Sequence, residues 1–268
     1  MRSQAVQRLR LLAGRRATRW ETRRFVIEGP KLLDEALAAG AAIESVYVEP
    51  ASAGTDHLVL AGRARDRGAH LYETEVGVLA RACDTATPQP VAAVVEMVDR
   101  TLDQLSAVRP DLVVVAVDLQ DPGNAGTVIR SAAASGAGAV VFCAGAVDVF
   151  NPKTVRASAG SVFHIPVVAG PPAEDVLDAA AAWGLRRVAT VARGGCAHDQ
   201  YDLAGPTAIV LGSESHGIPD RLADRLDALI TIPMVAASES LNVAMAATVV
   251  CFEAARQRRR DLAGGEQR

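Results

Sequence analysis

Five polar side chains in the C-terminal part of the chain could take part in a reaction. They fall into three segments, which hold Asn124 with Arg130, Glu214, and Ser240 with Asn242. Amide, hydroxyl, carboxylate and guanidinium groups can give acid/base or electrostatic help to a reaction when they converge on it. Each segment follows a strand-like apolar run, so we predict that the three loops form one site.

Each of these residues also has an ordinary structural explanation. Asn124 could cap a helix, and Arg130 could form a salt bridge on a helix surface. Apolar residues on both sides of Arg130 weaken the second explanation. Glu214 could begin a helix, where acids favour the dipole, and Ser240 and Asn242 could cap the last helix. The residue types alone leave both kinds of explanation open.

In order and spacing, the three segments resemble the sequence motifs of the SpoU (TrmH-type) RNA ribose methyltransferases. The motif-like stretches are residues 121–130, 211–219 and 232–244, and the resemblance extends over residues 113–256. Residues 25–31 also resemble the opening of that family's N-terminal substrate-binding domain.

The resemblance implies S-adenosylmethionine-dependent 2′-O-methylation of structured RNA. It favours ribosomal RNA, because the shortest transfer-RNA members of the family lack an extra N-terminal domain. A transfer-RNA methyltransferase and a non-catalytic RNA-binding assembly factor remain alternatives. Antibiotic-resistance methyltransferases share the same plan, so housekeeping and resistance roles are not distinguished.

The resemblance also implies a role for each polar residue. Arg130 would activate the ribose hydroxyl and hold the phosphate; because a guanidinium is normally protonated, we expect electrostatic activation rather than base catalysis. Asn124 would order the same corner, and Glu214 would orient Arg130 or the RNA. Ser240 and Asn242 would hydrogen-bond near the active centre.

The resemblance also implies a cofactor pocket that is formed chiefly by backbone groups. The backbone of Gly212 would approach the cofactor closely, and Ile232, Met234 and Leu241 would line the adenosyl pocket. We expect no metal, since the four cysteines are widely spaced and the histidines show no ligand spacing.

Arginines are concentrated near the N-terminus, although the net charge of the chain is −3. Between residues 2 and 24 there are eight arginines and one acid, which favours contact with phosphate groups over a merely solvated helix face. The candidates for RNA contact are Arg15, Arg16, Arg23 and Arg24. Lys153 and Arg156 resemble an RNA-facing position of the family; helix capping by Thr154 with solvated charges is the alternative.

The composition fits a cytoplasmic protein with one large domain or two ordinary ones. Half of the 268 residues are hydrophobic, so a sizeable core can form. No apolar run is long and uncharged enough to predict a membrane span, and the arginine-rich start lacks a secretory apolar core.

Element patterns predict two α/β domains, over 1–100 and 108–268, and the resemblance implies that the first is an RNA-binding domain and the second a methyltransferase domain. Residues 1–24 are predicted to form one basic helix, and residues 99–110 a linker. Six continuous apolar runs follow, which indicate a parallel sheet covered on both faces. The predicted strands of this sheet are residues 112–118, 139–143, 165–168, 187–191, 207–211 and 229–232.

Pattern alone predicts an ordinary Rossmann-like sheet in the second domain. The resemblance implies instead a deep trefoil knot, which pattern cannot supply because knots are nearly absent from proteins. It also implies a homodimer packed through the knot region. The apolar positions of residues 243–254 on the last helix would fit that packing, and would equally fit an internal core.

Overall fold

The computed structural model describes residues 2–83, 87–235 and 241–265. The chain divides into two compact units. The N-terminal unit consists of Met1–Val98 together with Phe150–His164, and the C-terminal unit consists of Asp99–Val149 and Ile165–Arg268. The predicted boundaries at residues 100 and 108 differ from this division in one segment, because residues 150–164 pack with the N-terminal unit.

The N-terminal unit is built on a four-stranded sheet in the order β1-β4-β2-β3. Only the β2–β3 pairing is parallel; β4 runs antiparallel to both of its neighbours. The strands are β1 (Arg24–Glu28), β2 (Ile43–Val48), β3 (His70–Glu73) and β4 (Val91–Glu96). The helices are α1 (Arg2–Gly14), α2 (Arg16–Thr22), α3 (Pro30–Ala38), α4 (Thr55–Asp66), α5 (Val78–Cys83) and α8 (Pro152–Ala157), followed by the 3₁₀ turn η1 (Ser161–Phe163).

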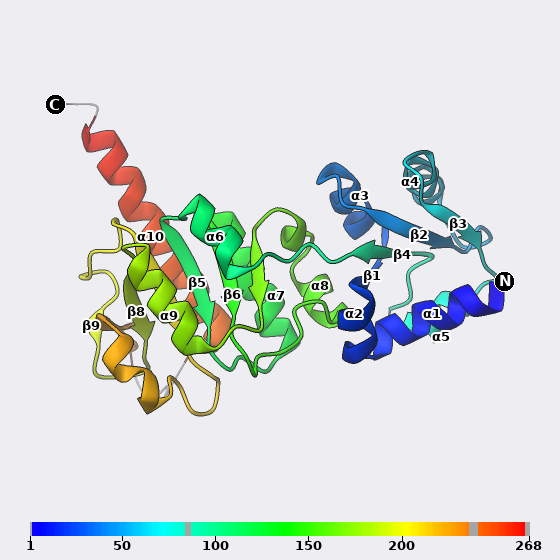
Figure 1. Cartoon of the computed structure of the whole chain (residues 1–268). Coiled ribbons are helices and arrows are strands. Elements are labelled where there is room, and N and C mark those ends of the chain that lie inside the picture. Colours follow the sequence, from blue (N-terminus) through cyan, green and yellow to red (C-terminus); the bar gives the residue numbers. More distant parts are fainter. Residues whose placement is uncertain (1, 84–86, 236–240, 266–268) are drawn as a thin grey trace. The chain divides into compact units, whose positions relative to one another are not determined.

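Helices cover both faces of this sheet (Figure 1). Helices α1 and α5 lie on one face, where Leu9, Leu12 and Leu79 form a core with Val26 and Val94 of the strands. Helices α3 and α4 contact the strands from the other side. Each face therefore buries a separate apolar layer, as expected for a small α/β unit.

The C-terminal unit is built on a seven-stranded sheet in the order β7-β6-β5-β10-β8-β11-β9. Every pairing in it is parallel. The strands are β5 (Leu112–Ala116), β6 (Ala139–Phe142), β7 (Val167–Ala169), β8 (Arg186–Thr190), β9 (Cys196–Ala197), β10 (Thr207–Leu211) and β11 (Ala228–Thr231). Strand β10 lies between β5 and β8, so the sheet departs from the ordinary doubly wound order. The predicted knot stays a prediction.

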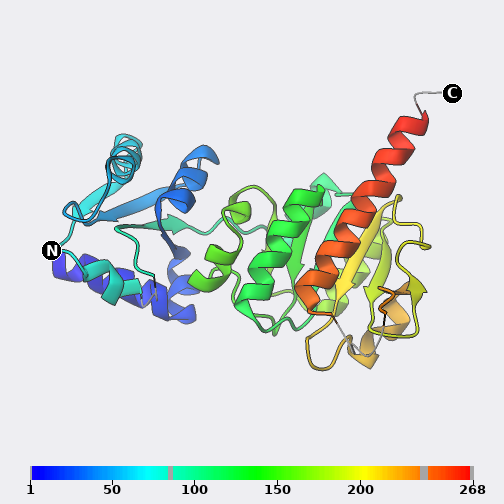
Figure 2. The same ribbon diagram turned by 180° about the vertical axis from the view of Figure 1, so that it is seen from behind.

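Helices cover both faces of the parallel sheet as well. Helices α7 and α10 lie side by side on one face (Figure 2), and α6 and α9 lie on the other (Figure 1). The helices of this unit are α6 (Leu102–Val108), α7 (Pro122–Ser135), α9 (Ala173–Ala182), the 3₁₀ helix η2 (Asp220–Arg225) and α10 (Val243–Gly265). Strands β5, β6 and β10 are buried along their whole length, which explains why they read as continuous apolar runs.

Several local predictions need correction. The predicted basic helix over 1–24 is two helices, because the chain is extended at Arg15, and its last residues enter β1. The predicted linker contains α6, whose first turn is held by a capping box between Thr101 and Gln104. Among the described residues, no helix is long and apolar enough to cross a membrane.

Candidate active site at three strand ends

A cavity of about 780 Å³ lies at the carboxyl ends of three adjacent strands of the C-terminal unit. Its wall includes Thr190 at the end of β8, Gly212 just after β10 and Ile232 just after β11. The start of α10 closes one side with Val243 and Ala246. Open parallel sheets bind ligands at this edge, so the cavity is the candidate site.

The segment after β10 forms a tight loop that presents Glu214 at the cavity. Ser213 and Gly217 exchange two backbone hydrogen bonds of 3.0 and 3.1 Å, and Gly217 has a φ of +68°. A Cβ at Gly212 would lie 2.3 Å from the carbonyl carbon of Gly217. Only glycine fits position 212, and its absent side chain lets the loop fold back on the strand end.

Asn124 lies within the first turn of α7 rather than in a loop, and it does not cap the helix. The cap is Asp121, whose carboxylate accepts a hydrogen bond of 2.7 Å from the backbone N–H of Asn124. Pro122 occupies the first helical position, where its missing N–H costs nothing. This arrangement frees the Asn124 side chain to make contacts outside its own helix.

The three motif segments meet through a hydrogen-bonded set of side chains, which we call the amide network: Asn242, Asn124 and Glu214. Asn242 Nδ2 donates to Asn124 Oδ1 at 3.0 Å, across 118 residues of sequence. Asn124 Nδ2 donates to Glu214 Oε1 at 2.9 Å, across 90 residues. The structure therefore brings one predicted residue from each segment into contact.

Glu214 is held as an anion at the end of the amide network. Partial burial opposes the charged form, but the hydrogen bond from Asn124 and those from the backbone N–H groups of Gln120 and Asp121 outweigh it. The pKa of Glu214 therefore lies below its ordinary value. A carboxylate in this state is an acceptor only, and at neutral pH it holds neighbours rather than accepting a proton from a substrate.

The four predicted cofactor contacts, Gly212, Ile232, Met234 and Leu241, all lie in the cavity wall. The buried apolar side chains of Ile230 on β11 and Val250 on α10 also belong to the wall, and Glu214 and Asn242 are among its polar residues. A wall that combines apolar side chains with polar groups suits an adenosyl group, which has an apolar base and polar ring atoms and hydroxyls. The residues present therefore fit S-adenosylmethionine.

Some wall residues escaped the sequence prediction. Residues 190–192 at the end of β8 and Asp220 at the start of η2 belong to the cavity. Thr190 is a polar residue at the end of β8, and a polar side chain at the carboxyl end of a parallel strand was the signal that could have identified it. Ser240 lies outside the described residues.

Arg130 lies on the exposed side of α7, away from the cavity wall. Among the described residues, no hydrogen bond or ion pair engages its guanidinium. The hydroxyl of the next residue, Ser131, lies 2.7 Å from that of Thr248 and joins α7 to α10. Within one copy of the chain, Arg130 and the amide network are not brought together.

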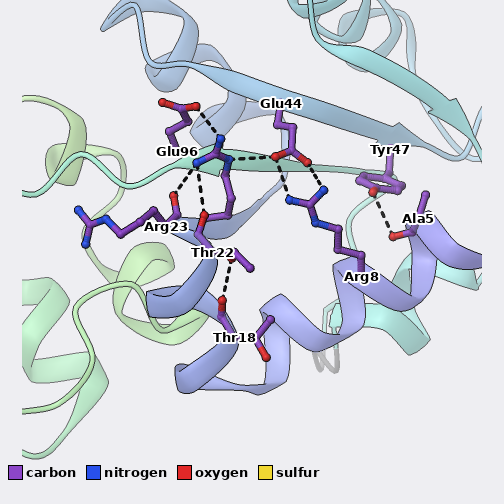
Figure 3. Close-up of polar contacts among 9 residues, drawn as sticks. Ala5, Arg8, Thr18, Thr22, Arg23, Glu44, Tyr47 and Glu96 are labelled. Carbon is purple, nitrogen blue, oxygen red and sulfur yellow. Dashed lines mark hydrogen bonds and ion pairs between the residues drawn. The ribbon is translucent and has the colours of Figure 1, made fainter.

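Two of the predicted RNA contacts are occupied by acids of the N-terminal unit. Arg24 is shared between Glu44 at 2.9 Å and Glu96 at 2.7 Å, and Figure 3 shows Arg8 on the other side of Glu44. Arg156 forms a 2.6 Å ion pair with the buried carboxylate of Glu28. These arginines hold the unit together, whatever else they contact.

The other four predicted RNA contacts are more exposed. Arg15, Arg16 and Lys153 are exposed, and no acid pairs with them among the described residues. The guanidinium of Arg23 lies 5.5 Å from the ring centroid of Trp20, and Figure 3 shows its side chain directed away from Glu44 and Glu96. The helix cap beside Lys153 is Asn151, not the Thr154 considered from sequence.

Two family models match the chain. The SpoU rRNA Methylase family model covers residues 111–252, and the MRM3-like substrate binding domain model covers residues 3–93. The first match takes in the candidate site with its three motif segments. The chain belongs to the SpoU rRNA methylase family.

Curated relatives of this family are similar over most of the chain. The Bacillus subtilis 23S rRNA (guanosine(2553)-2′-O)-methyltransferase RlmP is 33% identical over 234 residues, which cover 87% of this chain and 89% of that protein. The Streptomyces viridochromogenes 23S rRNA (uridine(2479)-2′-O)-methyltransferase is 39% identical over 177 residues, 64% of this chain and 61% of the other.

Solved structures share the fold of both units. The AdoMet-bound rRNA methyltransferase of Sinorhizobium meliloti has a TM-score of 0.83 and 32% identity, and 94% of each chain is covered. The SpoU methyltransferase AviRb of Streptomyces viridochromogenes, in complex with AdoMet, has a TM-score of 0.84 and 30% identity over 96% of this chain and 99% of that one. These similarities agree with the α/β fold predicted from the sequence.

Proposed function

We propose that this protein transfers a methyl group from S-adenosylmethionine to a ribose 2′-hydroxyl of ribosomal RNA. The observation that carries the proposal is the amide network at the rim of an adenosyl-sized cavity, because it unites all three described motif segments at one strand edge. Two relatives that share this architecture are named 23S rRNA 2′-O-methyltransferases. Ribosomal RNA is present in the cytoplasm, where we expect the protein to act.

The chemistry requires alignment and charge stabilisation more than a strong base. Bound S-adenosylmethionine supplies an electrophilic methyl group on a positively charged sulfur. Ile232, Met234 and Leu241 in the cavity wall would hold the adenosyl part of the cofactor and so fix the position of its methyl group, and most of the rate gain would come from such positioning. Arg130 holds the RNA phosphate and stabilises negative charge on the ribose oxygen as its proton leaves.

Arg130 is proposed to act on the cavity of a second copy, within a homodimer. Its guanidinium is exposed and lies outside the cavity wall of its own chain. Beside α7, α10 exposes Met245, Val249 and Phe252, which recur at helical spacing and form an apolar stripe, and the exposed Leu241 lies just before the helix. A second copy that covers this stripe would bury α7 and α10 at the interface, and could bring Arg130 to the partner's site.

The N-terminal unit is proposed to bind the RNA through Arg15, Arg16, Arg23 and Lys153. The exposed Arg15, Arg16 and Lys153 are the predicted contacts without an acid partner among the described residues, so their charge remains available for phosphates. The match of the N-terminal part to a substrate binding domain supports RNA binding by this unit.

The test is methyl transfer from labelled S-adenosylmethionine to purified 23S ribosomal RNA and to transfer RNA. We expect label at one ribose of ribosomal RNA, and mapping of ribose methylation in cells with and without the protein identifies the nucleotide. Label in transfer RNA alone would support a transfer-RNA methyltransferase. RNA binding without transfer or S-adenosylhomocysteine binding would support a non-catalytic assembly factor.

A further inference from the structure

We propose that Asn124 is a positioning residue that couples occupancy of the cofactor cavity to α7, the helix that carries Arg130. This inference rests on the proposed function and gives Asn124 a role other than contact with the substrate. Because Arg130 is proposed to act on the partner's cavity, a methyl donor bound in one copy would favour RNA binding by the Arg130 that this copy presents to the partner's site. Three features of the amide network carry the argument.

The first feature is that the orientation of each amide is determined. Asn242 Oδ1 accepts hydrogen bonds from the backbone N–H groups of Ala244 and Met245, so its Nδ2 must face Asn124. That donor requires Asn124 to present Oδ1, and the carboxylate of Glu214 requires it to present Nδ2. A flipped Asn124 would place oxygen against oxygen and nitrogen against nitrogen.

The second feature is that backbone groups anchor the network at both ends. One end is the first turn of α10, through Ala244 and Met245. The other end is the loop before α7, where the N–H groups of Gln120 and Asp121 point to Glu214 at 3.4 Å. Both polar atoms of the Asn124 side chain have partners within the chain, so its amide links elements rather than reaching out for a ligand.

The third feature is the position of the three residues relative to the cavity. Glu214 and Asn242 belong to its wall, whereas Asn124 stands behind them in the first turn of α7. A ligand that fills the cavity packs against the loop and the helix start that hold Glu214 and Asn242. When Glu214 and Asn242 are fixed, their hydrogen bonds fix the side chain of Asn124. Because α7 is a rigid helix, this also fixes the position of Arg130, six residues and about 9 Å further along it.

Because coupling between two binding sites is reciprocal, it can be measured without turnover. In the wild-type protein we expect S-adenosylhomocysteine to tighten binding of a ribosomal RNA fragment by about fivefold or more. In Asn124→Ala the RNA affinity should be the same with and without S-adenosylhomocysteine. Calorimetry measures the affinity for S-adenosylhomocysteine. Fluorescence anisotropy of labelled RNA measures the affinity for RNA with and without S-adenosylhomocysteine.

Exchanging the hydrogen-bond donor of Asn124 with the acceptor of Glu214 distinguishes a positioning role of Asn124 from a general effect on protein stability. Asn124→Asp places a second carboxylate against Glu214 and should abolish the coupling and lower kcat at least tenfold. Adding Glu214→Gln supplies an amide donor to the new carboxylate, while Asn242 still donates to its other oxygen. The double variant should regain coupling and come within a few-fold of the wild-type kcat.

The matched control is Thr127→Val, on the same helix but outside the amide network, since Thr127 bonds only the carbonyl of Gly123 at 2.9 Å. It should keep the coupling, and melting temperatures of all variants identify any that fail to fold. Wild-type protein that binds both ligands without coupling, or a double variant no better than Asn124→Asp, would overturn the inference. Failure of the wild-type protein to bind S-adenosylhomocysteine at all would instead overturn the proposed function.

Discussion

The guanidinium of Arg156 lies 2.6 Å from the carboxylate of Glu28, 128 residues earlier in the chain. The Glu28 side chain is 3% exposed and that of Arg156 is 34% exposed. Burial raises the pKa of Glu28, and the charge and hydrogen bond of Arg156 only partly offset this effect. The pair fixes α8 to the last residue of β1, and so holds the 150–164 segment within the N-terminal unit.

The two partners should therefore respond unequally to mutation. Arg156→Gln leaves a buried carboxylate without its cation, and should lower the free energy of unfolding at pH 7 by about 3 kcal/mol or less, because Arg156 is partly solvated. Glu28→Gln removes the buried charge itself and should cost less. Thermal or urea unfolding at pH 7 measures both.

The pH dependence of the Glu28→Gln variant has a definite sign. Because the folded state raises the pKa of Glu28, this group adds stability below its ordinary value of 4.5, and the added stability is lost as pH rises through the folded pKa. The variant should gain stability relative to wild type as pH increases over that window. The double variant Glu28→Gln with Arg156→Gln should be more stable than Arg156→Gln alone.

If Arg156→Gln left the free energy of unfolding unchanged but weakened RNA binding, Arg156 would be an RNA contact rather than a structural partner of Glu28.

Arg130→Ala should lower methyl transfer at least about 100-fold, because it removes the group that we propose stabilises developing charge on oxygen. Binding of S-adenosylhomocysteine should stay within about threefold of wild type, since Arg130 lies outside the cavity wall. Arg130→Lys keeps the charge without the planar fork, and should recover only part of the rate. Unchanged turnover in Arg130→Ala would remove this residue from the mechanism.

Mixed dimers test whether Arg130 serves the partner's cavity. Ala246 lines the cavity, so Ala246→Trp should block cofactor binding while leaving Arg130 in place. Inactive Arg130→Ala and inactive Ala246→Trp proteins, mixed and allowed to exchange, should regain up to about a quarter of the wild-type rate, because half of the dimers are mixed and each of those has one complete site. The coupling through Asn124 would lower this value, since the intact Arg130 then belongs to the copy whose own cavity is blocked. If Arg130 acts in its own chain, the mixture stays inactive.

The apolar stripe on α10 should control the oligomeric state. Met245 is 56% exposed and Phe252 is 44% exposed, which is unusual for large apolar side chains that recur on one helix face. Met245→Glu with Phe252→Glu should convert a dimer into a monomer in analytical ultracentrifugation and abolish transfer. Arg259→Glu, an exposed position near the end of the same helix, serves as the control and should leave the dimer intact. A wild-type protein that sediments as a monomer would contradict the dimer.

Local patterns predict strands well where the residues are buried on both faces. Residues 207–211 form β10 over the predicted range. A short continuous apolar run bounded by turn residues is typical of a strand that is buried on both faces. The position of β10 between β5 and β8 could not be predicted in this way. Strand order depends on pairings between distant residues, and apolar periodicity carries no information about which strands are neighbours.

The motif segments were located from the sequence, whereas the partners of their side chains were not. Asn124 and Asp121 both have side chains that suit a helix cap, and Pro122 at the first helical position was the signal that favoured Asp121. The ion pairs of Arg24 and Arg156 involve acids up to 72 and 128 residues away. A cluster of arginines therefore looks uniform in sequence, although the fold commits some members to internal pairs and leaves others exposed.

That division predicts which arginines bind RNA. Replacing Arg15 and Arg16 by alanine should weaken binding of a ribosomal RNA fragment. It should also lower the magnitude of the slope of log K against log salt by about 1 to 2, because binding with fewer phosphate contacts releases fewer counterions. Arg63→Ala with Arg65→Ala removes the same charge from α4, where the two arginines pair with Asp34 and Asp66, and should change the slope little. Folding should be unaffected in both double variants, since all four side chains are exposed. Equal slopes for the two double variants would show that net charge, rather than the exposed arginines between α1 and α2, drives the binding.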